Sequence, residues 1–173
     1  MTPMTYEIIL RDVPELRVVT EARDVDQAHL LDWLPGAMAR VVQAPALTTE
    51  TQKWVDRPPT PDPVFVVIYQ GNPNDGPTRV EVCAPVAAGG DQTLPAHREA
   101  FVRVTKAQVT SGELGAVYEA IENGIGDRGL TIVAAPREVY WTDFMSAGDG
   151  DEVFDVAFPV ADSGVSSVAR ATV

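Results

Sequence analysis

Residues 80–87 read VEVCAPVA and residues 154–161 read FDVAFPVA, and this pair of segments decides the fold. Val, Pro, Val and Ala recur at matching places in the two segments. Each segment closes a stretch of chain whose pattern is strand, helix and hairpin, in that order. The match can arise by chance in a chain rich in Val and Ala, but the shared order of elements favours an internal duplication.

The first half, residues 5–87, opens with strands and then changes to a helical pattern. Between residues 25 and 42, apolar side chains recur three and four positions apart, which is typical of one face of an α-helix. Pro35 lies inside this stretch and predicts either a kink or two short helices. The predicted elements of this half are strands at 6–10 and 16–20, a helix at 25–42, an irregular loop at 43–63, and a hairpin with strands at 64–69 and 79–84.

The second half, residues 94–161, repeats this order. Thr110 and Glu113 have the spacing of a capping box, which predicts the start of a helix. One helical stripe follows, made of Leu114, Val117, Ile121 and Ile125. The predicted strands of this half cover residues 99–106, 138–144 and 153–160, with an acidic loop at 146–151.

These patterns predict an α+β fold built from a duplicated βαββ unit. Neither unit can cover its own sheet, so we expect two antiparallel sheet halves related by a pseudo-two-fold axis. A groove along their seam is a common place for a ligand pocket. We expect one domain over residues 1–161 and a poorly ordered tail over residues 162–173, which are rich in Ser and Ala.

Composition and charge exclude several classes of protein. With 173 residues, of which 45% are hydrophobic and 22% charged, the chain has the profile of an ordinary globular domain and not of a disordered segment. Its 13 Lys and Arg against 25 Asp and Glu give a formal net charge of −12. Such a surface repels phosphate backbones, so direct nucleic-acid binding is not expected. The same negative field attracts organic cations.

The compartment follows from the cysteine content and the first residues. Cys83 is the only cysteine, which excludes an intramolecular disulfide and fits a reducing compartment. The apolar run at residues 8–10 is too short for a signal peptide or a membrane span. We therefore expect a cytoplasmic protein.

Several motifs suggest chemistry that their context does not support. Residues 124–129 read GIGDRG and match a dinucleotide-binding pattern, but they end a predicted helix instead of opening one, so we interpret them as a helix stop. His29 and His97 have no cysteine or carboxylate at ligand spacing. Cys83 lies in the middle of a strand, where a buried, inert thiol is expected. We expect no metal and no cofactor.

The segment of residues 136–141, PREVYW, carries the best candidate for a site. Side chains alternate across a strand, so Glu138 and Tyr140 share one face while Val139 and Trp141 share the other. If Trp141 packs against the helices, Glu138 faces the opposite side. A carboxylate next to aromatic rings in a concave site suits an organic cation, because Coulomb attraction offsets the cost of removing the carboxylate from water. The alternative is a solvated strand residue.

In its order of features the chain resembles the GyrI-like family. The resemblance rests on the opening strand at Tyr6, the turn at Pro14, the helix that ends near Gly129, and the segments REVY at 137–140 and FPV at 158–160. It covers about residues 5–161. This family includes the effector-binding domains of multidrug-responsive bacterial transcription regulators, and the resemblance implies a duplicated βαββ unit with a ligand groove between its halves.

The resemblance also implies roles for individual residues. In the drug-sensing members a glutamate just before a tyrosine meets cationic aromatic drugs, and this position corresponds to Glu138, with Tyr140 as its neighbour. Tyr69 lies at the corresponding place in the first half and is expected to face the groove. Trp54 lies in the loop before the first hairpin and is expected to act as a flap.

The sequence contains no helix-turn-helix pattern, so we expect a stand-alone protein that binds or sequesters a small molecule and influences DNA only through another protein. The resemblance leaves two alternatives. One is a hydrolase of cyclopropane-bearing alkylating natural products that uses Glu138 as a general base on water. The other is a protein that binds gyrase or a separate regulator. The residues alone do not distinguish binding of a ligand from its turnover.

Overall fold

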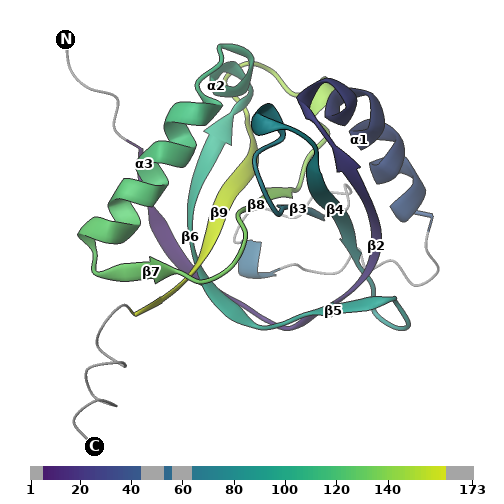
Figure 1. Cartoon of the computed structure of the whole chain (residues 1–173), viewed down its shortest axis with the longest axis horizontal. Helices are drawn as coiled ribbons and strands as arrows, with labels where there is room; N and C mark the ends of the chain where they lie inside the picture. The colour runs from purple at the N-terminus through teal and green to yellow at the C-terminus, as the bar shows by residue number, and fades with distance from the viewer. Residues whose placement is uncertain (1–5, 44–52, 56–63, 163–173) are drawn as a thin grey trace, which may run out of the picture.

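The computed structural model describes residues 6–43, 53–55 and 64–162. The two repeated segments lie in strands β4 (Thr78–Pro85) and β9 (Glu152–Asp162), one in each half. In the described residues, nine strands form one antiparallel sheet in the order β1-β6-β9-β8-β3-β4-β2-β5, and β7 pairs with β9 off this path. The sheet is strongly curled, with α3 and α1 on its two flanks (Figure 1).

The order of strands confirms the predicted duplication. Starting at the seam between β3 and β8 and moving outward, one half continues with β4 and β2, and the other half continues with β9 and β6. Each half therefore contains strand, helix, strand and strand in the same arrangement. The elements of the first unit are β2 (Leu16–Val25), α1 (Gln27–Val41), β3 (Phe65–Tyr69) and β4, and those of the second are β6 (His97–Thr105), α3 (Leu114–Asp127), β8 (Arg137–Tyr140) and β9.

A short strand before each unit pairs with the other half. β1 (Ile9–Val13) precedes β2 in the chain but pairs with β6, with Ile9 opposite Phe101. β5 (Gln92–Leu94) precedes β6 but pairs with β2, with Leu94 opposite Leu16. Because each strand crosses to the neighbouring unit, the two halves form one continuous structure.

Helix α1 is one helix of 15 residues with Pro35 inside it, so of the two outcomes predicted from Pro35, the division into two short helices does not occur. Asp26 caps its start by accepting a hydrogen bond from the His29 amide at 3.0 Å. Pro35 has no amide to donate to the carbonyl of Leu31. Because Leu31 is 66% exposed, water can replace the missing donor. The helix packs on the sheet through its buried residues Leu30, Trp33, Ala37 and Val41.

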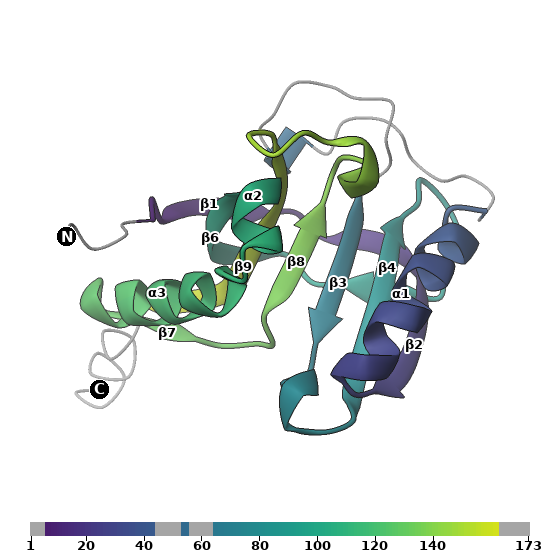
Figure 2. The same ribbon diagram turned by 90° about the horizontal axis from the view of Figure 1, so that it is seen from above.

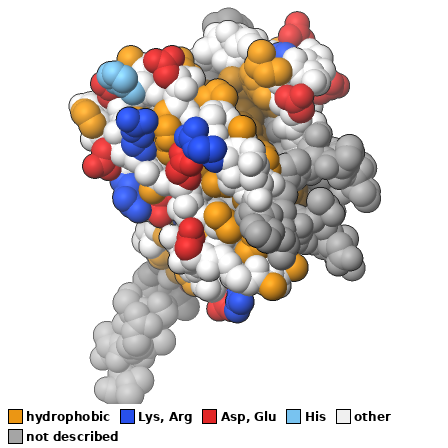
Figure 3. Space-filling view, turned by 90° about the vertical axis from the view of Figure 1, so that its right-hand side faces the viewer, with side chains coloured by type: hydrophobic (Ala, Val, Ile, Leu, Met, Phe, Trp, Pro, Cys, Tyr) orange, Lys and Arg blue, Asp and Glu red, His pale blue; other side chains and the backbone are white. Residues whose placement is uncertain are grey.

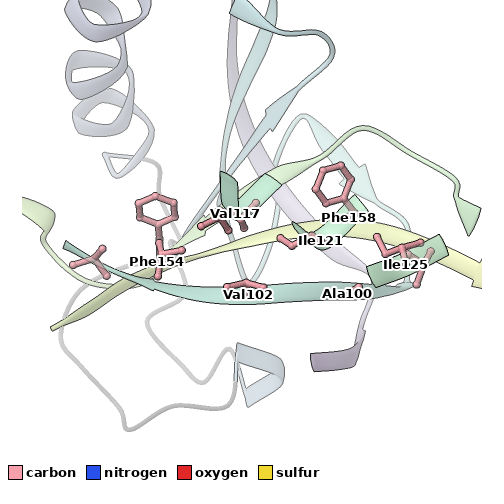
Figure 4. Packing of buried hydrophobic residues seen from close by; sticks show 11 residues of the cluster. Ala100, Val102, Val117, Ile121, Ile125, Phe154 and Phe158 are labelled. Carbon is pink, nitrogen blue, oxygen red and sulfur yellow. The ribbon is translucent and has the colours of Figure 1, made fainter. Parts of the chain in front are cut away.

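Helix α3 packs on the other flank through the predicted stripe. Val117, Ile121 and Ile125 are buried against β6 and β9, next to Phe154 and Phe158 (Figure 4). The predicted capping box was wrong. Thr110 ends the short helix α2 (Lys106–Thr110), and Glu113 at the start of α3 makes no capping hydrogen bond through its side chain. The capping box lies one helix earlier, where Thr105 and Gln108 satisfy each other's backbone amides.

Several boundaries differ from the predicted ones. β1 lies three residues later than predicted, and β2 extends to residue 25 because its pairing with β4 continues to Thr78. β8 ends at Tyr140, since residues 144–146 form a 3-10 turn, η3. β5 and β7 (Leu130–Ile132) were not predicted. Of the predicted tail, Asp162 belongs to β9, and residues 163–173 lie outside the described residues.

The predicted loop at 43–63 lies mostly outside the described residues, apart from its start and the 3-10 turn η1 (Lys53–Val55). Another 3-10 turn, η2 (Pro73–Asp75), lies in the hairpin between β3 and β4. Gly129 has a φ of 70° and follows the end of α3, as expected for the helix stop predicted at residues 124–129.

Candidate binding groove

A groove of about 1310 Å³ lies between the two helices, above the seam of the sheet. Figure 2 shows β8, β3 and β4 side by side between α3 and α1. One wall is a stripe of α1, the other is a stripe of α3, and the floor consists of side chains from β3, β8 and β9. Ligand pockets for drug-sized molecules usually measure about 300–1,000 Å³, so this groove has room for a large organic molecule.

Glu138 lies at the floor of the groove and accepts hydrogen bonds from three tyrosines. Its Oε1 accepts from the hydroxyl groups of Tyr140 at 2.6 Å and Tyr69 at 3.1 Å. Its Oε2 accepts from the hydroxyl group of Tyr118 at 2.7 Å. A carboxylate has about four acceptor positions, so one position on Oε2 is left for a further donor.

Strand alternation and register bring this cluster together. Glu138 and Tyr140 are two residues apart on β8 and therefore share a face of the sheet. In the neighbouring strand, Val67 is opposite Glu138, which places Tyr69 two residues further along on the same face. The predicted set of Glu138, Tyr140 and Tyr69 is thus brought together across the seam between the halves.

Tyr118 completes the cluster and was not predicted. It extends from α3 to Glu138 and packs edge-on against Phe158, with ring centroids 5.8 Å apart. In sequence it follows Val117 of the buried stripe, so its position is on the adjacent face of the helix. That helical position is the only signal that could have identified it.

The helices cover the face of the sheet that carries Glu138, so the condition considered for the sequence, that Trp141 packs against the helices, is not met. Trp141 lies on the opposite face, in a cluster with Val55 and Val139. Trp54 packs on that face too, and the Arg11 guanidinium lies 5.0 Å from its ring centroid. Trp54 is not among the residues that line the groove, so the structure does not bring the predicted flap to this site.

Burial dominates the electrostatics of Glu138. The residue is only 4% exposed, and this desolvation raises the pKa of its carboxyl group, although the three tyrosine hydroxyls act in the opposite direction. Burial and the nearby carboxylate raise the pKa of Tyr69, Tyr118 and Tyr140 well above the ordinary value, so all three remain hydrogen-bond donors.

Among the described residues of the groove, no positive side chain balances Glu138. The described residues that line it include four carboxylates, Glu119, Glu122, Glu138 and Asp143, and no Lys, Arg or His. Elsewhere the two signs are mixed, as on the side of the molecule formed by α1 and β2, where Lys and Arg lie among Asp and Glu (Figure 3). The groove is therefore a negative and largely apolar site.

On the opposite face of the sheet, buried carboxylates contact cationic side chains. Asp155 is fully buried and accepts hydrogen bonds from Arg11 and Arg103, each at 2.8 Å. Arg11 also contacts Glu99 at 2.8 Å, and His97 lies 2.7 Å from the same carboxylate. Burial alone raises the pKa of Glu99, but His97 and Arg11 outweigh it and hold the pKa below its ordinary value. Buried carboxylates on this face have cationic partners, whereas Glu138 has only hydroxyl groups.

Other candidate sites carry no chemistry of their own. No group of three or more His, Cys, Asp or Glu among the described residues is arranged to hold a metal ion. Cys83 is buried, which raises the pKa of its thiol to about 11 and leaves it unreactive. A smaller hollow of about 410 Å³ lies near the start of α1, where a hydrogen bond of 2.6 Å joins His29 Nδ1 and Asp26 Oδ1. In the described part of the chain, none of the helices is long and apolar enough to cross a membrane.

Comparison with known proteins supports the fold. No family model and no curated protein matches the chain significantly. Among solved structures, the crystal structure of the EcmrR C-terminal domain matches with a TM-score of 0.70 and 22% sequence identity, over 92% of this chain and 99% of that one. The cryo-EM structure of the EcmrR-DNA complex in EcmrR-RPo also matches. Its TM-score is 0.66 and its sequence identity 20%, over 91% of this chain and 58% of that one. At these identities the likeness establishes a shared fold.

Proposed function

We propose that the groove binds organic cations with an aromatic or apolar body, within a domain that spans residues 1–161. The charge imbalance at Glu138 carries this proposal. A carboxylate that is 4% exposed has lost its hydration, and its pKa is raised because no cation replaces that hydration. A bound cation restores the missing interaction, so Glu138 discriminates in favour of positive ligands.

The remaining lining suits a flat or elongated body. Tyr140 stacks on Phe154 with ring centroids 4.5 Å apart, and both residues line the groove. Aromatic faces attract cations through the ring quadrupole, and the effect is larger where water is excluded. The wall formed by α1 adds apolar contact area. The site thus combines one buried charge with a broad apolar surface, which fits a lipophilic cation better than a small ammonium ion.

The sequence resemblance and the structural comparison support this proposal. The position of Glu138 corresponds to the glutamate that meets cationic drugs in the resembling family. The same fold occurs in the C-terminal domain of EcmrR, a protein that has also been studied in complex with DNA. Binding or sequestering a small molecule is the activity that these observations favour.

Hydrolysis is the second candidate, and the remaining acceptor position on Glu138 Oε2 favours it. A carboxylate with a raised pKa in a cleft is suited to act as a general base. Glu138 would accept a proton from water as the water oxygen attacks a cyclopropane carbon. The carbon–carbon bond of the ring would break, and its electron pair would pass to the conjugated system of the substrate. Tyr118 and Tyr140 would hold the carboxylate in place.

The test compares two dyes and one reactive substrate. Rhodamine 6G, a planar cation, should bind the protein more tightly than the neutral aromatic probe N-phenyl-1-naphthylamine, as measured by calorimetric titration. Equal or weaker binding of the cation would contradict the proposal. Mass spectrometry of a cyclopropane-bearing alkylating agent after incubation tests the second candidate, since hydrolysis adds one water to the molecule. Recovery of the intact compound would exclude hydrolysis of that substrate.

A further inference from the structure

The two helical walls of the groove differ in chemistry although the duplication makes them equivalent in position. The stripe of α1 that faces the groove consists of Gln27, Leu30, Leu31, Leu34, Pro35 and Met38. The stripe of α3 consists of Leu114, Gly115, Tyr118, Glu119 and Glu122. One wall is apolar along nearly its whole length, and the other carries two exposed carboxylates.

Helix geometry places these carboxylates in line with the buried site. Tyr118 and Glu122 are four residues apart, so they lie on the same face of α3, about 6 Å or roughly one turn apart along the axis. The hydroxyl group of Tyr118 marks the position of Glu138, since the two are 2.7 Å apart. Along this wall a ligand therefore meets an inner carboxylate at the floor and two outer carboxylates whose backbone positions lie within about one helical turn of Tyr118.

The outer carboxylates have no structural partner. Within the part of the chain that the structure describes, neither the Glu119 nor the Glu122 side chain makes a hydrogen bond or an ion pair. Asp143 also faces the groove, but it caps η3 through the amide of Met145 and has a local role. One turn before Glu119, Gly115 leaves the wall bare, because a Cβ there would meet no atom within 4 Å. The α3 wall thus offers space beside free negative charge.

We infer that the preferred ligands are amphipathic dications. This inference rests on the proposed function, because it assigns the first cationic centre to Glu138. The aromatic body of the ligand lies against the apolar wall of α1, and a second cationic group on a short arm lies against Glu119 and Glu122. The volume of about 1310 Å³ is large enough for such a molecule. A monocation of the same shape leaves the α3 wall without a partner.

The inner and outer sites differ in their sensitivity to salt. Glu119 and Glu122 are exposed, and exposed ion pairs contribute little individually and weaken as the Debye length falls from about 10 Å at 0.1 M to about 3 Å at 1 M. The buried charge of Glu138 is screened much less. We expect the second positive charge to improve affinity about three- to tenfold at low salt and to lose most of this advantage at 1 M.

Ethidium and propidium form a suitable pair of probes. They share the phenanthridinium ring, but propidium replaces the ethyl group with a three-carbon arm that ends in a quaternary ammonium group. Calorimetric titration at low salt should show that the 173-residue chain binds propidium about three- to tenfold more tightly than ethidium. The double variant Glu119→Gln/Glu122→Gln should reduce propidium affinity to the level of ethidium and change ethidium affinity at most about twofold.

A matched control separates local from general electrostatics. Asp32 and Asp127 lie on α1 and α3, are exposed, and do not line the groove. The variant Asp32→Asn/Asp127→Asn makes the same change in net charge and should leave the preference for propidium intact. If the control variant abolishes the preference equally, or if wild-type protein binds both dyes with equal affinity, the inference is wrong. If neither dye binds, or if both bind independently of Glu138, the proposed function itself is wrong.

Discussion

Replacing Glu138 with glutamine removes the charge of the groove and keeps its shape. The side chain is 4% exposed, and its oxygens accept hydrogen bonds from three tyrosines. Glutamine retains one acceptor oxygen and nearly the same volume, so the cluster can persist in the variant. A loss of affinity for a cation then reports electrostatics and not packing.

The expected magnitude follows from the burial of the carboxylate. Two opposite charges 4 Å apart attract by about 4 kcal/mol at an effective dielectric constant of 20. Part of this gain offsets the cost of removing the ligand charge from water, and hydrogen bonds to charged groups contribute about 1.5–3 kcal/mol net. We therefore expect Glu138→Gln to weaken binding of rhodamine 6G by about 1.4–3 kcal/mol, or about ten- to a hundredfold.

Calorimetric titration of rhodamine 6G and N-phenyl-1-naphthylamine against both proteins measures this difference. The neutral probe should bind both proteins with similar affinity, because it makes no use of the charge. Glu81→Gln is the matched control, since Glu81 is also buried but lies on β4 outside the groove lining. Equal losses for the two probes in Glu138→Gln would refute the reasoning and would make Glu138 a residue of shape or folding.

Three further predictions concern stability and partners. Burial raises the pKa of Glu138 in the folded state, so the contribution of this group to stability is present below the ordinary carboxyl pKa of 4.5 and is lost as pH rises through its folded pKa. Urea denaturation should show that the stability of Glu138→Gln relative to wild type increases from pH 4 to pH 8, and a constant difference would contradict this. Asp155→Asn removes the carboxylate that Arg11 and Arg103 share and should reduce the free energy of unfolding by about 3–5 kcal/mol. The variant should still bind rhodamine 6G in native buffer, and an unchanged free energy of unfolding would show that this ionic network is not coupled to folding. With a net charge of −12, the chain should not retard duplex DNA in a gel at physiological salt, with or without rhodamine 6G, and a salt-dependent shift would contradict this reading of its surface.

The sequence predicted the fold where the information is local. The repeated segments at 80–87 and 154–161 identified the duplication, and alternation along one strand placed Glu138 and Tyr140 on the same face. What sequence could not provide is the pairing of distant segments. The crossing of β1 and β5 to the opposite halves depends on contacts between residues far apart in the chain, which no local pattern encodes.

The orientation of the candidate site also depended on distant contacts. Both faces of the sheet are buried, so an aromatic residue such as Trp141 fits either face, and alternation alone does not indicate which face the helices cover. Alternation correctly placed Trp141 and Glu138 on opposite faces, but the condition that Trp141 packs against the helices is not met. Tyr118 was not predicted because its hydrogen bond to Glu138 depends on α3 lying across the seam from Tyr69.

A crystal structure of the protein with rhodamine 6G would test most directly whether the Glu138 carboxylate holds an organic cation in the groove between α1 and α3. We expect the dye in the groove, with its rings against the α1 wall and the tyrosines and with its positively charged amine next to Glu138. A dye bound on another surface, or bound in the groove with its charged amine directed away from Glu138, would contradict the claim.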